Sequence, residues 1–192
     1  VNKDGSFQRT ARFRGPDLDS AVAAELVAVA GRINNAFRRL GSGWSIFVEA
    51  QRHEAAIYPA GRFPDAASGL VDAERKADFE EEGVHFVSAY YLTFLYLPPA
   101  EEAARAETWL YEGRERTGVD PHEILRAFVD RTDRVLALLD GFMPECAWLD
   151  SSETLTYLHS TVSTKRYRVR MPETPIYLDA LLTDQPLTGG LE

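Results

Sequence analysis

The sequence has little of three things that many functional sites require: cysteine, lysine and long hydrophobic runs. Its 192 residues include one cysteine, Cys146, which excludes an internal disulfide and any metal site built from several thiolates. This usage suits a reducing compartment. The most apolar stretch, residues 89–97, is far shorter than the roughly 20 residues that a membrane-spanning helix needs. We therefore expect no transmembrane segment.

The scarcity of lysine bears on nucleotide binding. A phosphate-binding loop of the form G-x-x-x-x-G-K-[ST] needs a lysine between a glycine and a serine or threonine. The sequence has only Lys3, Lys76 and Lys165, and none of them follows a glycine. The Gly-Ser-Gly run at residues 41–43 follows a predicted helix, so it is interpreted as a helix stop. The sequence thus predicts no Walker-type site, no enzyme activity and no bound cofactor in these residues.

Other catalytic patterns are incomplete. His122-Glu123 begins like a zinc-protease helix, but Arg126 stands where the second histidine belongs. Ser45 lacks the second glycine of the G-x-S-x-G turn of hydrolases. Cys146 lies in a short apolar stretch, which is typical of a packed core residue. We accordingly predict no catalytic or metal-binding residue, although an enzyme site assembled from distant residues stays open.

The charge balance is acidic. Asp and Glu number 30 against 21 Lys and Arg, which gives a formal net charge of −9 and a pI near 5.0. Such a surface repels nucleic-acid backbones and anionic lipids unless a local basic patch overrides it. With 45% hydrophobic residues, the chain is long enough to form one globular domain. We expect a single domain over residues 1–192.

Apolar periodicity predicts an α+β fold, in which a mixed, largely antiparallel sheet is covered by several amphipathic helices. The expected strands are 6–14, 44–49, 84–97, 146–149 and 166–171. The expected helices are 20–40, 65–82, 100–116, 120–140 and 150–162. Strand 84–97 is apolar on both faces in its second half, which predicts a central strand. Helix 65–82 is mostly polar, so we expect it to cover the sheet from outside.

Several helix positions are specific enough to test. The helix at 20–40 is expected to use Asp19 or Ser20 as its cap. Pro121 after Asp120 marks the first turn of the next clear helix, and Asp150 with Glu153 forms a capping box. The predicted buried stripes are Leu26, Ala30, Ile33, Phe37 and Leu40 in one helix, Leu125, Phe128, Thr132, Val135 and Leu139 in another, and Leu155, Leu158 and Val162 in a third.

A basic strip stands out in this acidic chain. It consists of Lys165, Arg166, Arg168 and Arg170. Strand alternation would place the three arginines on one face and turn Tyr167, Val169 and Met171 inward. One interpretation is an exposed edge strand that charge protects from aggregation. The other is a docking strip for an acidic partner or a nucleic-acid backbone.

Five runs of sequence carry a family resemblance. They are NKDGSFQR at 2–9, WSIFVEAQR at 44–52, YLTF at 91–94, TLTYLHST at 154–161 and PIYLDALL at 175–182. With these runs the chain resembles the N-terminal region of TrbE-type conjugal-transfer proteins, in the CagE/TrbE family of type IV secretion ATPases. The resemblance extends over the whole chain, and none of its motifs is catalytic.

The resemblance implies a role in assembly. In this family the nucleotide site, with its ATP and Mg²⁺, lies in a later C-terminal domain. The Asp4-Gly5 turn, which has almost no strand before it, likewise predicts a piece of a longer chain. The implied location is the bacterial cytoplasm, at the cytoplasmic face of the inner membrane, and the implied partners are a small inner-membrane subunit of the TrbD type and neighbouring copies of the chain. The alternative is a nucleic-acid contact module that uses residues 165–170.

Overall fold

The centre of the molecule is a four-stranded antiparallel sheet with the strand order β2-β3-β1-β4. The computed structural model describes residues 2, 4–55, 57–81, 83–98, 121–174 and 178–182. The strands are β1 (Phe7–Arg14), β2 (Trp44–Glu54), β3 (Phe86–Tyr96) and β4 (Glu145–Trp148). The expected α+β class is confirmed, and β3 is an interior strand, as the sequence predicted.

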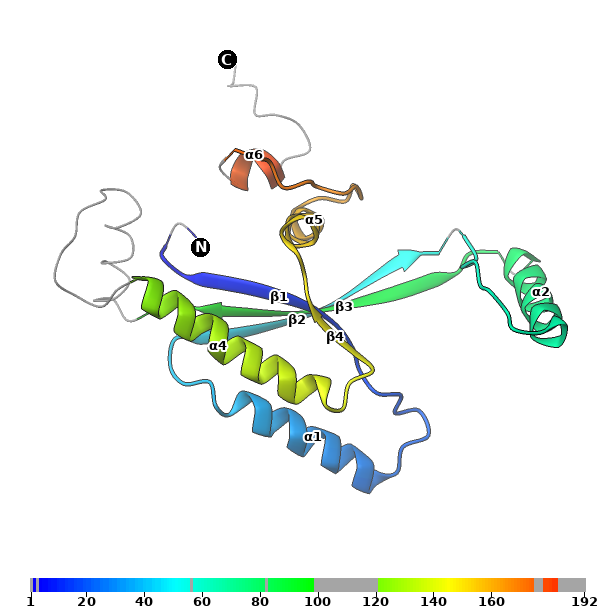
Figure 1. Ribbon diagram of the computed structural model, residues 1–192, viewed down its shortest axis with the longest axis horizontal. Coiled ribbons are helices and arrows are strands. Elements are labelled where there is room, and N and C mark those ends of the chain that lie inside the picture. Colours follow the sequence, from blue (N-terminus) through cyan, green and yellow to red (C-terminus); the bar gives the residue numbers. More distant parts are fainter. Residues whose placement is uncertain are drawn as a thin grey trace, which may run out of the picture.

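Helices lie on both sides of this sheet. They are α1 (Ala23–Phe37), α2 (Ala66–Glu81), α4 (Pro121–Asp140), α5 (Ser151–Val162) and α6 (Leu178–Leu182). Figure 1 shows α1 and α4 together on one side of the sheet and α5 on the other. The expected helix at 100–116 and the expected cap Asp120 lie outside the described residues. None of the helices in the described ranges is both long and apolar enough to span a membrane.

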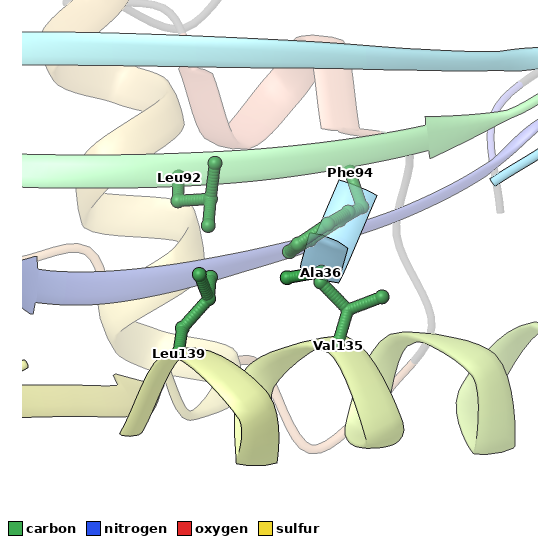
Figure 2. Packing of buried hydrophobic residues seen from close by; sticks show 5 residues of the cluster. All are labelled: Ala36, Leu92, Phe94, Val135 and Leu139. Carbon is green, nitrogen blue, oxygen red and sulfur yellow. The ribbon is translucent and has the colours of Figure 1, made fainter. Parts of the chain in front are cut away.

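The main core fills the space between the sheet and the pair α1 and α4. Leu92 and Phe94 project from β3 toward Val135 and Leu139 of α4, and Ala36 of α1 completes the cluster (Figure 2). Burial of such side chains is the main stabilising term of the fold. The predicted stripe of α4 is confirmed at Phe128, Thr132, Val135 and Leu139, which are all buried. Leu125 is partly exposed, and Ile124 is buried instead because it stands one helical turn before Phe128.

Helix α1 differs from its prediction at both the cap and the stripe. Its N-cap is Val22, whose backbone N–H donates to the Glu25 carboxylate at 3.0 Å, so neither Asp19 nor Ser20 caps it. Ile33 and Phe37 pack inward as expected, but Leu26 and Ala30 are exposed. The N-terminal half of the helix extends past the core, and its apolar side chains face solvent.

Helix α2 does not cover the sheet, contrary to expectation. Figure 1 shows it at the far end of the β2–β3 hairpin, and none of its residues is buried. It is held there by Phe79, whose ring stacks on His85 with centroids 3.9 Å apart, and by Asp72, which accepts a hydrogen bond from Tyr58 at 2.7 Å. These contacts use a different side of α2 from the thin apolar stripe that the sequence suggested.

The β2–β3 hairpin is longer than the sheet around it. β2 pairs with β3 from Trp44 opposite Tyr96 to Glu54 opposite Phe86. β1 pairs with β3 only as far as Phe13 opposite Tyr90. We call the projecting part the arm: β2 after Ala50, helix α2, and β3 before Tyr90. It consists of a two-stranded ribbon with a helix at its tip.

Candidate functional site

The basic strip is not a strand, which corrects the sequence prediction. Residues 164–171 run along α5 in an irregular conformation and take no part in the described sheet. The backbone N–H of Val169 donates to the Thr156 hydroxyl, and that of Met171 donates to the Ser152 hydroxyl, each at 3.0 Å. Side chains of α5 thus take the place of a partner strand. Of the three apolar residues expected to point inward, only Val169 is buried.

The strip forms one wall of a cleft with a volume of about 820 Å³. The opposite wall is the end of β2, and α5 forms the base. Lys165, Arg166 and Arg168 line the cleft, whereas Arg170 does not. Two further arginines from distant parts of the chain join them, Arg12 of β1 and Arg52 of β2. Sequence analysis missed both because no local pattern links them to the strip.

Gln51 joins the two walls. It is 6% exposed, and its amide nitrogen donates to Glu49 and to the Ser160 hydroxyl, both at 2.8 Å. Its amide oxygen accepts a hydrogen bond from Arg166 at 2.9 Å. One buried amide therefore links β2, α5 and the strip. Such a satisfied polar network specifies one arrangement of its members.

Two tyrosines form the apolar part of the cleft. The rings of Tyr91 and Tyr157 lie 4.5 Å apart, and the Tyr157 hydroxyl donates to Glu49 at 2.9 Å. Burial raises the pKa of both phenols above the ordinary value, so they are neutral at physiological pH. Leu149 adds an aliphatic contact.

The cleft is positive in a negative protein. Five cationic and two acidic residues line it, a net formal charge of +3 with histidines neutral. The acidic pair is Glu54 and Glu153, and Arg12 also pairs with Glu145 at 2.9 Å. Burial and the nearby charge of Arg166 lower the pKa of His53, as a positive local potential would. This surface is suited to an anionic ligand.

The described residues offer little for catalysis. No group of three or more His, Cys, Asp or Glu side chains among them is placed to hold a metal ion. Cys146 packs against the main core, and burial raises the pKa of its thiol to about 11. A thiol with such a pKa is a poor nucleophile at neutral pH. Its environment agrees with the packing role that the sequence indicated.

A second surface lies on the outer side of α1. Val22, Leu26 and Val27 are 62%, 45% and 73% exposed, and Ala23 and Ala30 lie on the same exposed side. The sequence carried a signal for it, because Glu25 is the one charged residue between positions 21 and 30. Periodicity alone assigns Leu26 to the core, and this hides the exposed face.

Comparison with known proteins places this α+β domain among the components of secretion motors. Residues 1–104 match the family described as "Type IV secretion system ATPase VirB4/TrbE, N-terminal domain". This match covers β1, α1, β2, α2 and β3. The chain therefore belongs to the VirB4/TrbE family of type IV secretion ATPases, and the resemblance found in the sequence is confirmed.

Two conjugal-transfer proteins are similar to the chain. "Conjugal transfer protein TrbE" of Rhizobium radiobacter is 32% identical over 206 residues, which cover 98% of this chain and 25% of that protein. A probable conjugal transfer protein TrbE of Sinorhizobium fredii (strain NBRC 101917 / NGR234) is 41% identical over 108 residues, 55% of this chain and 72% of that protein. The chain thus spans a quarter of the length of the first relative.

Proposed function

We propose that this chain is a non-catalytic assembly domain that docks a type IV secretion ATPase onto inner-membrane channel subunits. The observation that supports this is the exposed apolar side of α1, formed by Val22, Leu26 and Val27. A contiguous apolar patch on a folded surface marks a site of protein interaction. The proposed partner is a small inner-membrane subunit of the TrbD type, met at the cytoplasmic face of the membrane.

In this proposal hydrolysis belongs to another region of the parent protein. ATP and Mg²⁺ bind in a C-terminal domain, while residues 1–192 act as a single domain without a nucleotide site. The support is that no lysine of the chain stands in a phosphate-loop context. The purified chain should show no magnesium-dependent ATP hydrolysis above a buffer blank. Turnover that scales with protein concentration contradicts the proposal.

Capture of the membrane subunit tests the docking surface. The tagged chain is co-expressed with a TrbD-type subunit and recovered in mild detergent. Replacing Leu26 and Val27 together by Glu should lower the recovered subunit at least about tenfold, because a tenfold loss needs only about 1.4 kcal/mol of binding energy. The matched control is Val162→Glu on α5, which changes another exposed valine. Equal capture by all three chains contradicts the assignment to α1.

A nucleic-acid contact module is the second candidate. Its support is the cleft, where Arg166 and Arg168 of the strip are joined by Arg52. The net charge of −9 opposes it, because the whole chain repels phosphates at long range. Binding of a single-stranded oligonucleotide through three phosphates should weaken with salt, with a log–log slope near about −2. An absence of binding at low salt excludes this candidate.

A further inference from the structure

We propose that the cationic cleft of one copy of this chain receives helix α2 of a second copy, in a head-to-tail contact. The inference rests on the proposed function in that it assigns one of the docking surfaces of the domain. It concerns a different surface from the apolar side of α1, so the two proposals can fail separately. The evidence begins with the side of α2 that faces solvent.

The outward side of α2 is both aliphatic and acidic. Residues spaced three and four apart share one side of a helix, and all members of this set are exposed. They are Leu70, Val71, Glu74, Asp78 and Glu81. The opposite side, with Phe79 and Asp72, makes the contacts that hold the helix to the arm. The helix is therefore held in place while its outward side is uncovered.

The charges of helix and cleft are complementary. α2 carries five carboxylates and two cations, a net formal charge of −3, against +3 for the cleft lining. The two cations, Arg75 and Lys76, fall on other sides of the helix, and Lys76 pairs with Glu80 at 3.7 Å. The outward side thus presents carboxylates alone. Opposite potentials of this kind set the register and the rate of association.

The sizes agree as well. A helix is about 10–12 Å across and rises about 5.4 Å per turn, so a cleft of this volume takes about two turns. Leu70, Glu74 and Asp78 span about two turns on one side. The apolar lining from Tyr91 and Leu149 matches the aliphatic residues, and the arginines match the carboxylates.

The occupant is a second copy because of where the helix lies. The cleft uses the base of the arm, at Gln51 to Glu54, and α2 stands at its tip, away from α5 (Figure 1). Each copy then carries one helix to give and one cleft to receive. Contacts between unlike surfaces are heterologous, and they build rings or open chains. A nucleic acid fits less well, because Glu54 and Glu153 in the lining repel phosphates.

Sedimentation of the purified chain at rising concentration tests the proposal. The wild type should self-associate, and Arg168→Glu in the cleft or Glu74→Lys on α2 should each weaken this at least about tenfold. Each variant has a matched control two to six residues away: Arg170→Glu lies outside the cleft, and Glu80→Lys lies off the outward side. Both controls should associate as the wild type does. Thermal melts check that every variant is folded.

A mixing experiment separates a head-to-tail contact from any other. The Arg168→Glu chain keeps an intact helix, and the Glu74→Lys chain keeps an intact cleft. Mixed together they should form a heterodimer that neither forms alone and that stops at two copies. The double variant in one chain restores the opposite charges and should regain association. Glu74 is exposed, so its variant paired with wild type serves if the cleft variant fails to fold.

Three results overturn the proposal. They are a wild type that stays monomeric at every concentration, a mixture that forms no heterodimer, and variants that lose oligonucleotide binding while self-association is unchanged. Capture of the membrane subunit is measured in parallel with Arg168→Glu. Retained capture with lost self-association supports the present inference and leaves the proposed function intact. Lost capture by the α1 variant with retained self-association supports the α1 surface alone.

Discussion

The two faces of the sheet are built from different chemistry, and Phe94 and Thr93 on β3 show this most clearly. Phe94 points toward α1 and α4 into an apolar cluster. Thr93 points the other way, where its hydroxyl pairs with that of Thr10 at 2.9 Å. One face is dry and packed, and the other is a buried hydrogen-bond network beside the cleft.

The difference teaches where stability and function are separated. Apolar burial stabilises the fold without directional requirements, so the α1 and α4 face gives a scaffold that tolerates similar side chains. The α5 face depends on paired polar groups, as at Gln51 and Glu49, which fix side chains at definite positions. The cleft lies on this second face.

The largest expected effect is at the packed face. Phe94→Ala removes a side chain that is completely buried and should lower the free energy of unfolding by about 3–5 kcal/mol. Urea denaturation followed by circular dichroism measures it. The control is Val48→Ala on the neighbouring strand, where the side chain is 65% exposed and the loss should stay below about 1 kcal/mol. Similar losses at both sites contradict the contrast between the faces.

The next effect is at the polar face. Thr93→Val leaves the buried Thr10 hydroxyl without its partner and should cost about 1–3 kcal/mol of unfolding free energy. Replacing both threonines by valine should cost less than the two single changes added together, because no orphaned hydroxyl of this pair is left. A double-mutant cycle in urea measures the coupling. Strict additivity shows that the pair does not interact.

A smaller effect is expected at the start of α5. The Asp150 carboxylate accepts from the Glu153 N–H at 2.7 Å, and the Glu153 carboxylate accepts from the Asp150 N–H at 2.8 Å. Asp150→Ala should cost about 1 kcal/mol of unfolding free energy. Because α5 forms the base of the cleft, self-association should weaken with it. An unchanged melting temperature contradicts a role for this cap in stability.

The smallest effect concerns pH at the cleft. Burial and Arg166 lower the pKa of His53 in the folded state, so the unfolded chain takes up its proton first as the pH falls. Stability should therefore decline as the pH drops through about 6.5, and His53→Gln should remove that part of the slope. Arg166→Gln should raise the pKa of His53 in an NMR titration. A pKa that does not move shows that Arg166 is not its neighbour in solution.

The sequence revealed those features whose partners lie a few residues apart. The capping box of Asp150 and Glu153 and the proline that opens α4 follow from local spacing, and the structure has both. The Asn2-to-Ser6 turn is also local, and Gly5 has the positive φ of 78° that favours glycine. β3 was identified as central because a strand covered on both sides is apolar on both sides.

Other features depend on partners that periodicity does not encode. The segment at 166–171 alternates like a strand, but its backbone donates to the hydroxyls of Thr156 and Ser152, so α5 determines its conformation. The cleft combines Arg12, Arg52 and Arg168, which are separated by most of the chain. α1 has the stripe of a buried helix over more residues than the core covers. In each case tertiary placement overrides the local pattern.

The arm has a mechanical consequence. Beyond Phe13 and Tyr90 the hairpin continues with backbone pairing between two strands only, and four residue pairs at about 3.4 Å each make a lever of about 14 Å before α2 begins. A slight change of twist where β1 stops swings the tip through a much larger arc. If the tip is gripped by a neighbour, movement in one subunit is passed to the next as a pull on a short rod.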